Sequence, residues 1–268
     1  MKFNFFGLFV LQFLLFSPSF NDLMAQSNTI QSRFQPPKGF TRLQLVKESF
    51  GEHLRNLPLK KEGSLVTYFD GEKKNNQAYC AVIDLPIGDK DLHQCADAVM
   101  RLRADYFFKL KQYDKIHFNF TNGFRVDYSK WNQGYRIAVK GNKTSWVKKA
   151  LPSNSEKEYW AYLEQIFQFA GTASLEKELK PISISQIQIG DVFIKGGFPG
   201  HAVIVVDMAV NSSGKKVFIL AQSYMPAQEL QILKNPNNAS LSPWYNEDFG
   251  ATLETPEWDF NRNQLKRF

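Results

Sequence analysis

The sequence predicts an α+β protein in which a helical first part is followed by an antiparallel sheet. Apolar residues recur at helical spacing between residues 92 and 110, which indicates an amphipathic helix. Three short apolar segments rich in β-branched residues then lie close together between residues 191 and 223. Their short connections favour antiparallel hairpins, so helices and sheet are largely segregated along the chain.

The first 25 residues are predicted to be a signal peptide. Lys2 gives a charged start, residues 5–16 form an apolar run, and Ala25 offers a small residue for cleavage. The alternative is an uncleaved anchor, but the run is shorter than the ~20 residues of a membrane-spanning helix. We therefore expect an exported protein, periplasmic or extracellular, with no stable membrane span after cleavage.

Composition narrows the classes of protein further. The chain has 268 residues, 43% of them hydrophobic, and a formal net charge of +7. This hydrophobic content excludes a disordered chain, and two cysteines exclude a disulfide-dense miniprotein. A basic exported protein is expected to favour anionic surroundings, such as cell-wall polymers or membrane headgroups. Nucleic acid is not an expected partner, because the basic residues are dispersed along an exported chain.

Behind the signal peptide we expect an N-terminal extension over residues 26–75 and one α+β domain over residues 76–268. Polar, proline-containing sequence over residues 26–39 suggests a leader or linker, and residues 70–77 suggest a solvated loop. The aromatic and β-branched stretch Tyr79–Leu85 then predicts a buried strand.

The first long helix follows the sequence PIGDK, with Asp89 or Asp91 as the expected N-cap. Cys95 falls in or just after its first turn. The positions that share its apolar face are Leu92, Cys95, Ala96, Val99, Leu102, Tyr106 and Leu110. His93 is expected at the surface, pointing away from Cys95.

The middle of the chain predicts a hairpin and a second helix. Residues 116–128 alternate in polarity around Asn122-Gly123, a typical hairpin turn. Ser155 and Glu158 form a capping box, and the helix that they begin is expected to end with Gly171 as C-cap. A short helix and the strands Asp191–Lys195, His201–Met208 and Val217–Ser223 are expected to follow.

Two residues, His201 and Cys95, are candidate catalytic residues. His201 stands at the head of an apolar strand, directly after a loop rich in glycine that would let a substrate approach. Cys95 stands at a helix N-terminus, where the helix dipole favours the thiolate. A surface histidine and a core cysteine are the alternative interpretations, and a disulfide between Cys80 and Cys95 is a third possibility in an oxidising compartment.

Nucleophile and base need a third polar side chain that orients the base, and Gln222 is the candidate. If His201 and Gln222 oppose each other, the register of the two strands pairs Asp207 with Lys216. Both side chains then point to one face of the sheet.

The segments QCADAVMRL, IGDVFI, GHAVIVV and FILAQ together resemble the core order of papain-like, NlpC-like and CHAP-like cysteine peptidases and amidases. The resemblance implies a papain-like core, with an N-terminal helix packed on an antiparallel sheet and an inserted β-hairpin. It also implies that Cys95 is the nucleophile, His201 the general base and Gln222 the orienting residue.

Almost the whole mature chain is also similar to a bacterial secreted family known only as a domain of unknown function. The similar stretches are GDKDLHQCADAVMRLRADY, HFNFTNGFRVDYSKW and AQSYMPAQELQILKNP. This second resemblance supports export and fold, and it implies no activity.

The leading hypothesis is an exported cysteine hydrolase that cleaves an amide or peptide bond, for example in cell-wall peptide. The alternatives are a noncatalytic exported binding protein on the same fold and an enzyme that transfers the acyl group to an amine. The binding hypothesis draws on Gln94 and Ala96, which replace the usual Asp or Ser beside the nucleophile. The sequence has no HExxH motif, no paired CxxC and no GxGxxG, so we expect no metal and no cofactor.

Overall fold

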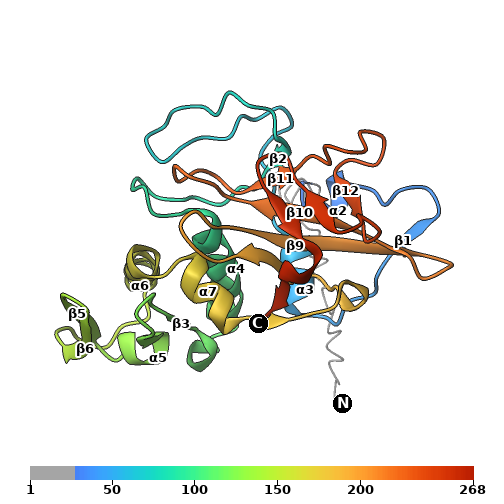
Figure 1. Cartoon of the computed structure of the whole chain (residues 1–268). Coiled ribbons are helices and arrows are strands. Elements are labelled where there is room, and N and C mark those ends of the chain that lie inside the picture. The colour runs from blue at the N-terminus through green and yellow to red at the C-terminus, as the bar shows by residue number, and fades with distance from the viewer. Residues whose placement is uncertain (1–27) are drawn as a thin grey trace, which may run out of the picture.

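The computed structural model describes residues 28–268, so the predicted signal peptide lies outside the described residues. A large antiparallel sheet forms the centre of the molecule (Figure 1). Its strands follow the order β2-β11-β10-β9-β8-β15-β7. Two more strands join it, β1 beside β9 and β12 beside β10. These strands are β1 (Phe40–Arg42), β2 (Tyr79–Val82), β7 (Lys180–Pro181), β8 (Val192–Lys195), β9 (His201–Asn211), β10 (Lys216–Gln222), β11 (Gln231–Leu233), β12 (Trp244–Asn246) and β15 (Leu265–Arg267).

Side chains alternate between the two faces of this sheet and create a core on each. On β9, Ala202 and Ile204 face the core shared with the helices, whereas Val203 and Val205 face the other core. The helices are α2 (Ile30–Arg33), α3 (Phe50–Arg55), α4 (Cys95–Lys109), α5 (Tyr128–Trp131), α6 (Glu156–Phe169) and α7 (Thr172–Glu178). The second core includes the hairpin of β13 (Thr252–Glu254) and β14 (Asp259–Asn261). The fold is therefore α+β, as predicted.

The first long helix begins later than the sequence predicts. Cys95 is its first residue and Gln94 its N-cap, with the backbone N–H of Gln94 donating to the Asp97 carboxylate at 3.0 Å. The expected cap Asp91 instead accepts a hydrogen bond from the backbone N–H of Ala227 at 2.7 Å. Asp91 therefore ties the segment before the helix to the loop after β10.

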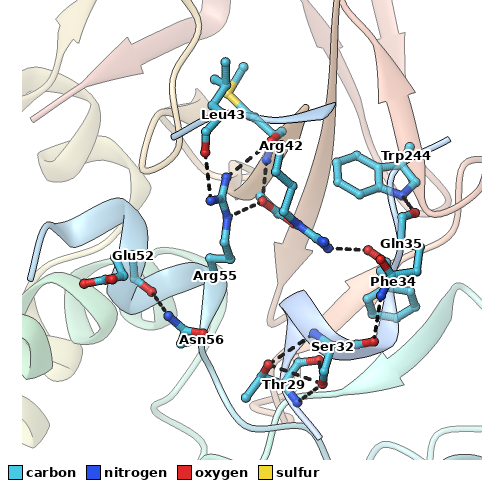
Figure 2. Close-up of polar contacts among 12 residues, drawn as sticks. Thr29, Ser32, Phe34, Gln35, Arg42, Leu43, Glu52, Arg55, Asn56 and Trp244 are labelled. Carbon is cyan, nitrogen blue, oxygen red and sulfur yellow. Dashed lines mark hydrogen bonds and ion pairs between the residues drawn. The ribbon is translucent and has the colours of Figure 1, made fainter. Parts of the chain in front are cut away.

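Residues 28–39, the described part of the segment predicted to be a leader or linker, pack against the rest of the fold through Ile30 and Phe34. Ile30 is fully buried, and β1 pairs with β9. Arg42 and Arg55 both donate to the buried carboxylate of Asp207 on β9, at 2.8 and 2.7 Å. Figure 2 shows the two guanidinium groups among the carbonyls that they also bind, including that of Leu43 at 2.9 Å from Arg55.

The segment between α4 and α7 lies to one side of the sheet, at the lower left of Figure 1. It contains the predicted hairpin, formed by β3 (His117–Asn119) and β4 (Arg125–Asp127), and the predicted helix α6 capped by Ser155. Helix α6 ends with Ala170 as C-cap, one residue before the expected Gly171. A second hairpin, β5 (Tyr135–Lys140) with β6 (Lys143–Lys148), is absent from the sequence prediction. Within residues 28–268, no helix combines the length and apolar character needed to cross a membrane.

Candidate active site

The three candidate residues stand at the ends of three different elements. Cys95 opens α4, His201 opens β9 and Gln222 closes β10. The backbone N–H groups of Ala96 and Ala202 act to lower the pKa of the Cys95 thiol. Cys95 therefore lies near the beginning of β9, on the face that Ala202 shares with the helices, whereas the His201 ring packs on Phe260 of the second core.

The register of β9 and β10 differs from the predicted one. Asp207 pairs with Ile219 and not with Lys216. An irregularity follows between Ile219 and Leu220, after which Ala221 pairs with Ile204. Gln222 therefore lies diagonally across from His201, two positions from direct opposition. The two side chains still share a face, because a shift of two positions preserves the alternation of the strand.

A hydrogen bond of 2.8 Å joins His201 Nε2 to Gln222 Oε1. The Gln222 amide nitrogen donates to the Glu257 carboxylate at 2.6 Å, which identifies the other amide atom as the oxygen facing His201. Because an amide oxygen only accepts, His201 Nε2 carries the proton of the neutral ring. Nδ1 is then the nitrogen with the free lone pair, as a general base requires.

Aromatic rings surround the imidazole. The centroids of Tyr224, Trp258 and Phe260 lie 4.8, 5.6 and 5.8 Å from that of His201, which is 1% exposed. Burial lowers the pKa of His201 to about 4, against the opposing effects of the Gln222 hydrogen bond and the Glu257 charge. The histidine is therefore neutral at physiological pH.

The Cys95 thiol is also held in its neutral form. It is 5% exposed, and burial, with a smaller contribution from Asp97, raises its pKa to about 12. Backbone N–H groups of Cys95, Ala96 and Ala202 act in the opposite direction. The backbone N–H groups at the helix N-terminus do favour the thiolate, in the predicted direction, but desolvation outweighs them, so the net shift of the pKa is upward.

Cys80 and Cys95 are both free thiols. Cys80 lies half-buried on β2, where burial raises its pKa to about 12. Its sulfur contacts the Ile232 carbonyl oxygen on the neighbouring strand β11 at 3.6 Å. Cys80 is thus a packing residue of the sheet.

Some residues around the site differ from expectation. His93 is fully buried, with its ring edge-on to Phe167, because it precedes the helix and does not lie on its outer surface. Lys74 is 3% exposed although it belongs to a stretch predicted to be a solvated loop, and it donates to Glu257 at 2.7 Å. Glu257 and Lys74 carry no motif that sequence reasoning could have used, since only the fold brings Lys74 to Glu257 and Glu257 to Gln222.

Residues 28–268 contain no group of three or more His, Cys, Asp or Glu side chains placed to hold a metal ion.

The model of the DUF4846 family, described as a domain of unknown function, matches residues 30–267. No curated protein and no solved structure matches the chain.

Proposed function

We propose that this chain, which belongs to the DUF4846 family, is an exported cysteine hydrolase that cleaves an amide or peptide bond. The observation that carries the proposal is the hydrogen bond between His201 Nε2 and Gln222 Oε1, which leaves Nδ1 as a base. It is joined by the position of Cys95 at the start of α4, where the backbone N–H of Ala202, the residue after that histidine, acts to lower the pKa of the thiol. A papain-like core is part of the same proposal, supported by the helix, strand and strand that carry the three residues.

In the proposed reaction, the Cys95 sulfur attacks the carbonyl carbon of the substrate while His201 Nδ1 takes the thiol proton. The C=O electron pair moves to the oxygen, where N–H groups of the first turn of α4 stabilise the negative charge. The tetrahedral intermediate collapses, the C–N bond breaks, and the imidazolium returns the proton to the leaving amine. Water, deprotonated by His201, then cleaves the thioester and releases a carboxylic acid and the free thiol.

The neutral resting pair fits a mechanism in which proton transfer accompanies attack. With a raised pKa at Cys95 and a lowered pKa at His201, the thiol keeps its proton until a substrate carbonyl is present. The net charge of +7 would favour substrates in an anionic envelope, such as cell-wall peptide. Transfer of the acyl group to an amine in place of water requires only a different acceptor at the last step.

A noncatalytic exported binding protein is the second candidate. Its supporting observation is the low exposure of both key side chains, 5% for Cys95 and 1% for His201. In that case the hydrogen bond between His201 and Gln222 only stabilises the fold, and the Cys95 thiol is unreactive.

Thiol labelling separates the two candidates. In a Cys80→Ala background, alkylation of Cys95 by iodoacetamide at pH 7 is expected to slow by about tenfold or more in His201→Ala, because the base that accepts the thiol proton is lost. His117→Ala is the matched control, since His117 lies on the distant hairpin strand β3 and should leave the rate unchanged. Equal rates with and without His201 would favour the binding protein.

A further inference from the structure

The Gln222 amide is held from both ends. Its oxygen lies 2.8 Å from His201 Nε2, and its nitrogen donates to Glu257 Oε2 at 2.6 Å. A carboxylate only accepts hydrogen bonds, so the amide must present its nitrogen to Glu257 and its oxygen to His201. Without that carboxylate, a half-turn of the amide would present the nitrogen to His201 instead.

Glu257 is itself fixed by a buried charge. Lys74 Nζ donates to Glu257 Oε2 at 2.7 Å, and its side chain is 2% exposed against 13% for Glu257. Gln228 Oε1 accepts a second hydrogen bond from Lys74 at 2.9 Å, while Asn76 donates to Glu257 Oε1 at 2.8 Å. Removing either member of the pair would leave the other charge buried and unpaired, so the carboxylate is held firmly in place.

We propose that Glu257, held by Lys74, is a positioning residue that selects the tautomer of His201 through the Gln222 amide. This inference rests on the proposed role of His201 as the base for Cys95. With the amide turned, Gln222 would donate to Nε2, and the ring proton would move to Nδ1. An imidazole in that tautomer has no lone pair at Nδ1 and cannot take the thiol proton.

The tautomer can be measured directly by ¹⁵N NMR of histidine-labelled protein without substrate. The chain has four histidines, and the His201 signals are assigned by their loss in His201→Ala. The wild type is expected to show His201 protonated at Nε2 alone. A wild-type His201 protonated at Nδ1 would overturn the proposal without recourse to any variant.

The double variant Lys74→Met/Glu257→Leu removes both charges together, which avoids an unpaired buried charge. It is expected to show a substantial population of His201 protonated at Nδ1, while unchanged signals from His53, His93 and His117 report an intact fold. A double variant that folds and keeps His201 wholly in the Nε2–H form would contradict the proposal.

Glu257→Gln is the conservative counterpart. Lys74 and Gln222 both donate to the Oε2 position, so a glutamine should place its oxygen there and turn its nitrogen towards Asn76, whose exposed amide can rotate. The wild-type tautomer should therefore persist in Glu257→Gln, and its replacement by the Nδ1–H form would contradict the proposal.

Peptide hydrolysis by the double variant is measured separately from the His201 tautomer. If peptide hydrolysis depends on Cys95, kcat of the double variant should fall with the fraction of the Nε2–H form while KM stays unchanged. If the tautomer responds as expected but no product depends on Cys95, the positioning role stands and the proposed hydrolase fails.

Discussion

Cys95 illustrates how two local effects compete at one residue. Its place at the first position of α4 favours the thiolate through the backbone N–H groups, yet burial raises its pKa to about 12. The helix position can be anticipated from the spacing of apolar residues. The burial depends on β9 and on residues distant in sequence, so the direction of the pKa shift could not be predicted.

The raised pKa of Cys95 predicts the pH dependence of its alkylation. In a Cys80→Ala/His201→Ala background, where no imidazole takes the thiol proton and only the thiolate reacts, the iodoacetamide rate should rise by about tenfold per pH unit from pH 7 to 10, since the thiolate fraction grows throughout that range. A thiol with an ordinary pKa would level off near pH 9. A plateau at or below pH 9 would contradict the direction of the pKa shift.

Gln222 could be identified as a candidate site residue from the sequence, whereas Glu257 could not. Gln222 could be proposed because it ends the strand after the one that carries His201. Glu257 and Lys74 could not, because one lies in a turn between short strands and the other in a charged loop that sequence places in solvent. Tertiary packing alone brings Lys74 to Glu257 and Glu257 to Gln222.

At the scale of elements, the strands β8, β9 and β10 were predictable, whereas the register between β9 and β10 was not. The segments that form β8, β9 and β10 follow from apolar patterning and turns, and all three are present. The register depends on the irregularity between Ile219 and Leu220, which has no signal in the sequence. Gln222 and His201 nonetheless meet because a diagonal pair on one face lies within side-chain reach.

The contact between α7 and β3 predicts a pH dependence of stability. Glu178 accepts a hydrogen bond from the Asn119 backbone at 2.7 Å, and burial raises its pKa from 4.5 to about 7. The unfolded carboxyl ionises at lower pH than the folded one, so this group favours folding fully below about pH 4.5 and loses that contribution as pH rises through 7.

Glu178→Gln keeps an oxygen for Asn119 and removes the charge. Urea unfolding should show the variant more stable than the wild type by about 2 kcal/mol at pH 8, with little difference at pH 4. The same stability change at both pH values would show that ionisation of Glu178 is not its cause.

At the scale of the whole molecule, the N-terminal extension is part of the sheet. Arg42 from β1 and Arg55 from α3 meet at Asp207, so residues distant in sequence are joined at one buried carboxylate. The packing of this extension on the domain could not be predicted, because the sequence of residues 26–39 is mostly polar. In the structure, Ile30 is the buried residue of the short helix α2. An α+β class could be read from the order of elements, whereas the covering of β9 by the extension required the folded chain.

Asp207→Asn should therefore destabilise the protein by about 3–5 kcal/mol, since two largely buried guanidinium groups lose their counter-charge. Asp248→Asn is the matched control. Its ion pair with Lys215 is more than half exposed on both sides, and its loss should cost less than about 1 kcal/mol. Equal effects in urea unfolding would contradict the structural role given to Asp207.

Cys95 is proposed to cleave an amide bond with His201 as base. Its most direct test is mass spectrometry of cell-wall peptide libraries after incubation with the mature wild-type protein or with Cys95→Ser. We expect products from the wild type alone, in complementary pairs whose masses sum to that of the substrate plus one water molecule. Identical product spectra from the two proteins, or no products from a folded wild type, would contradict it.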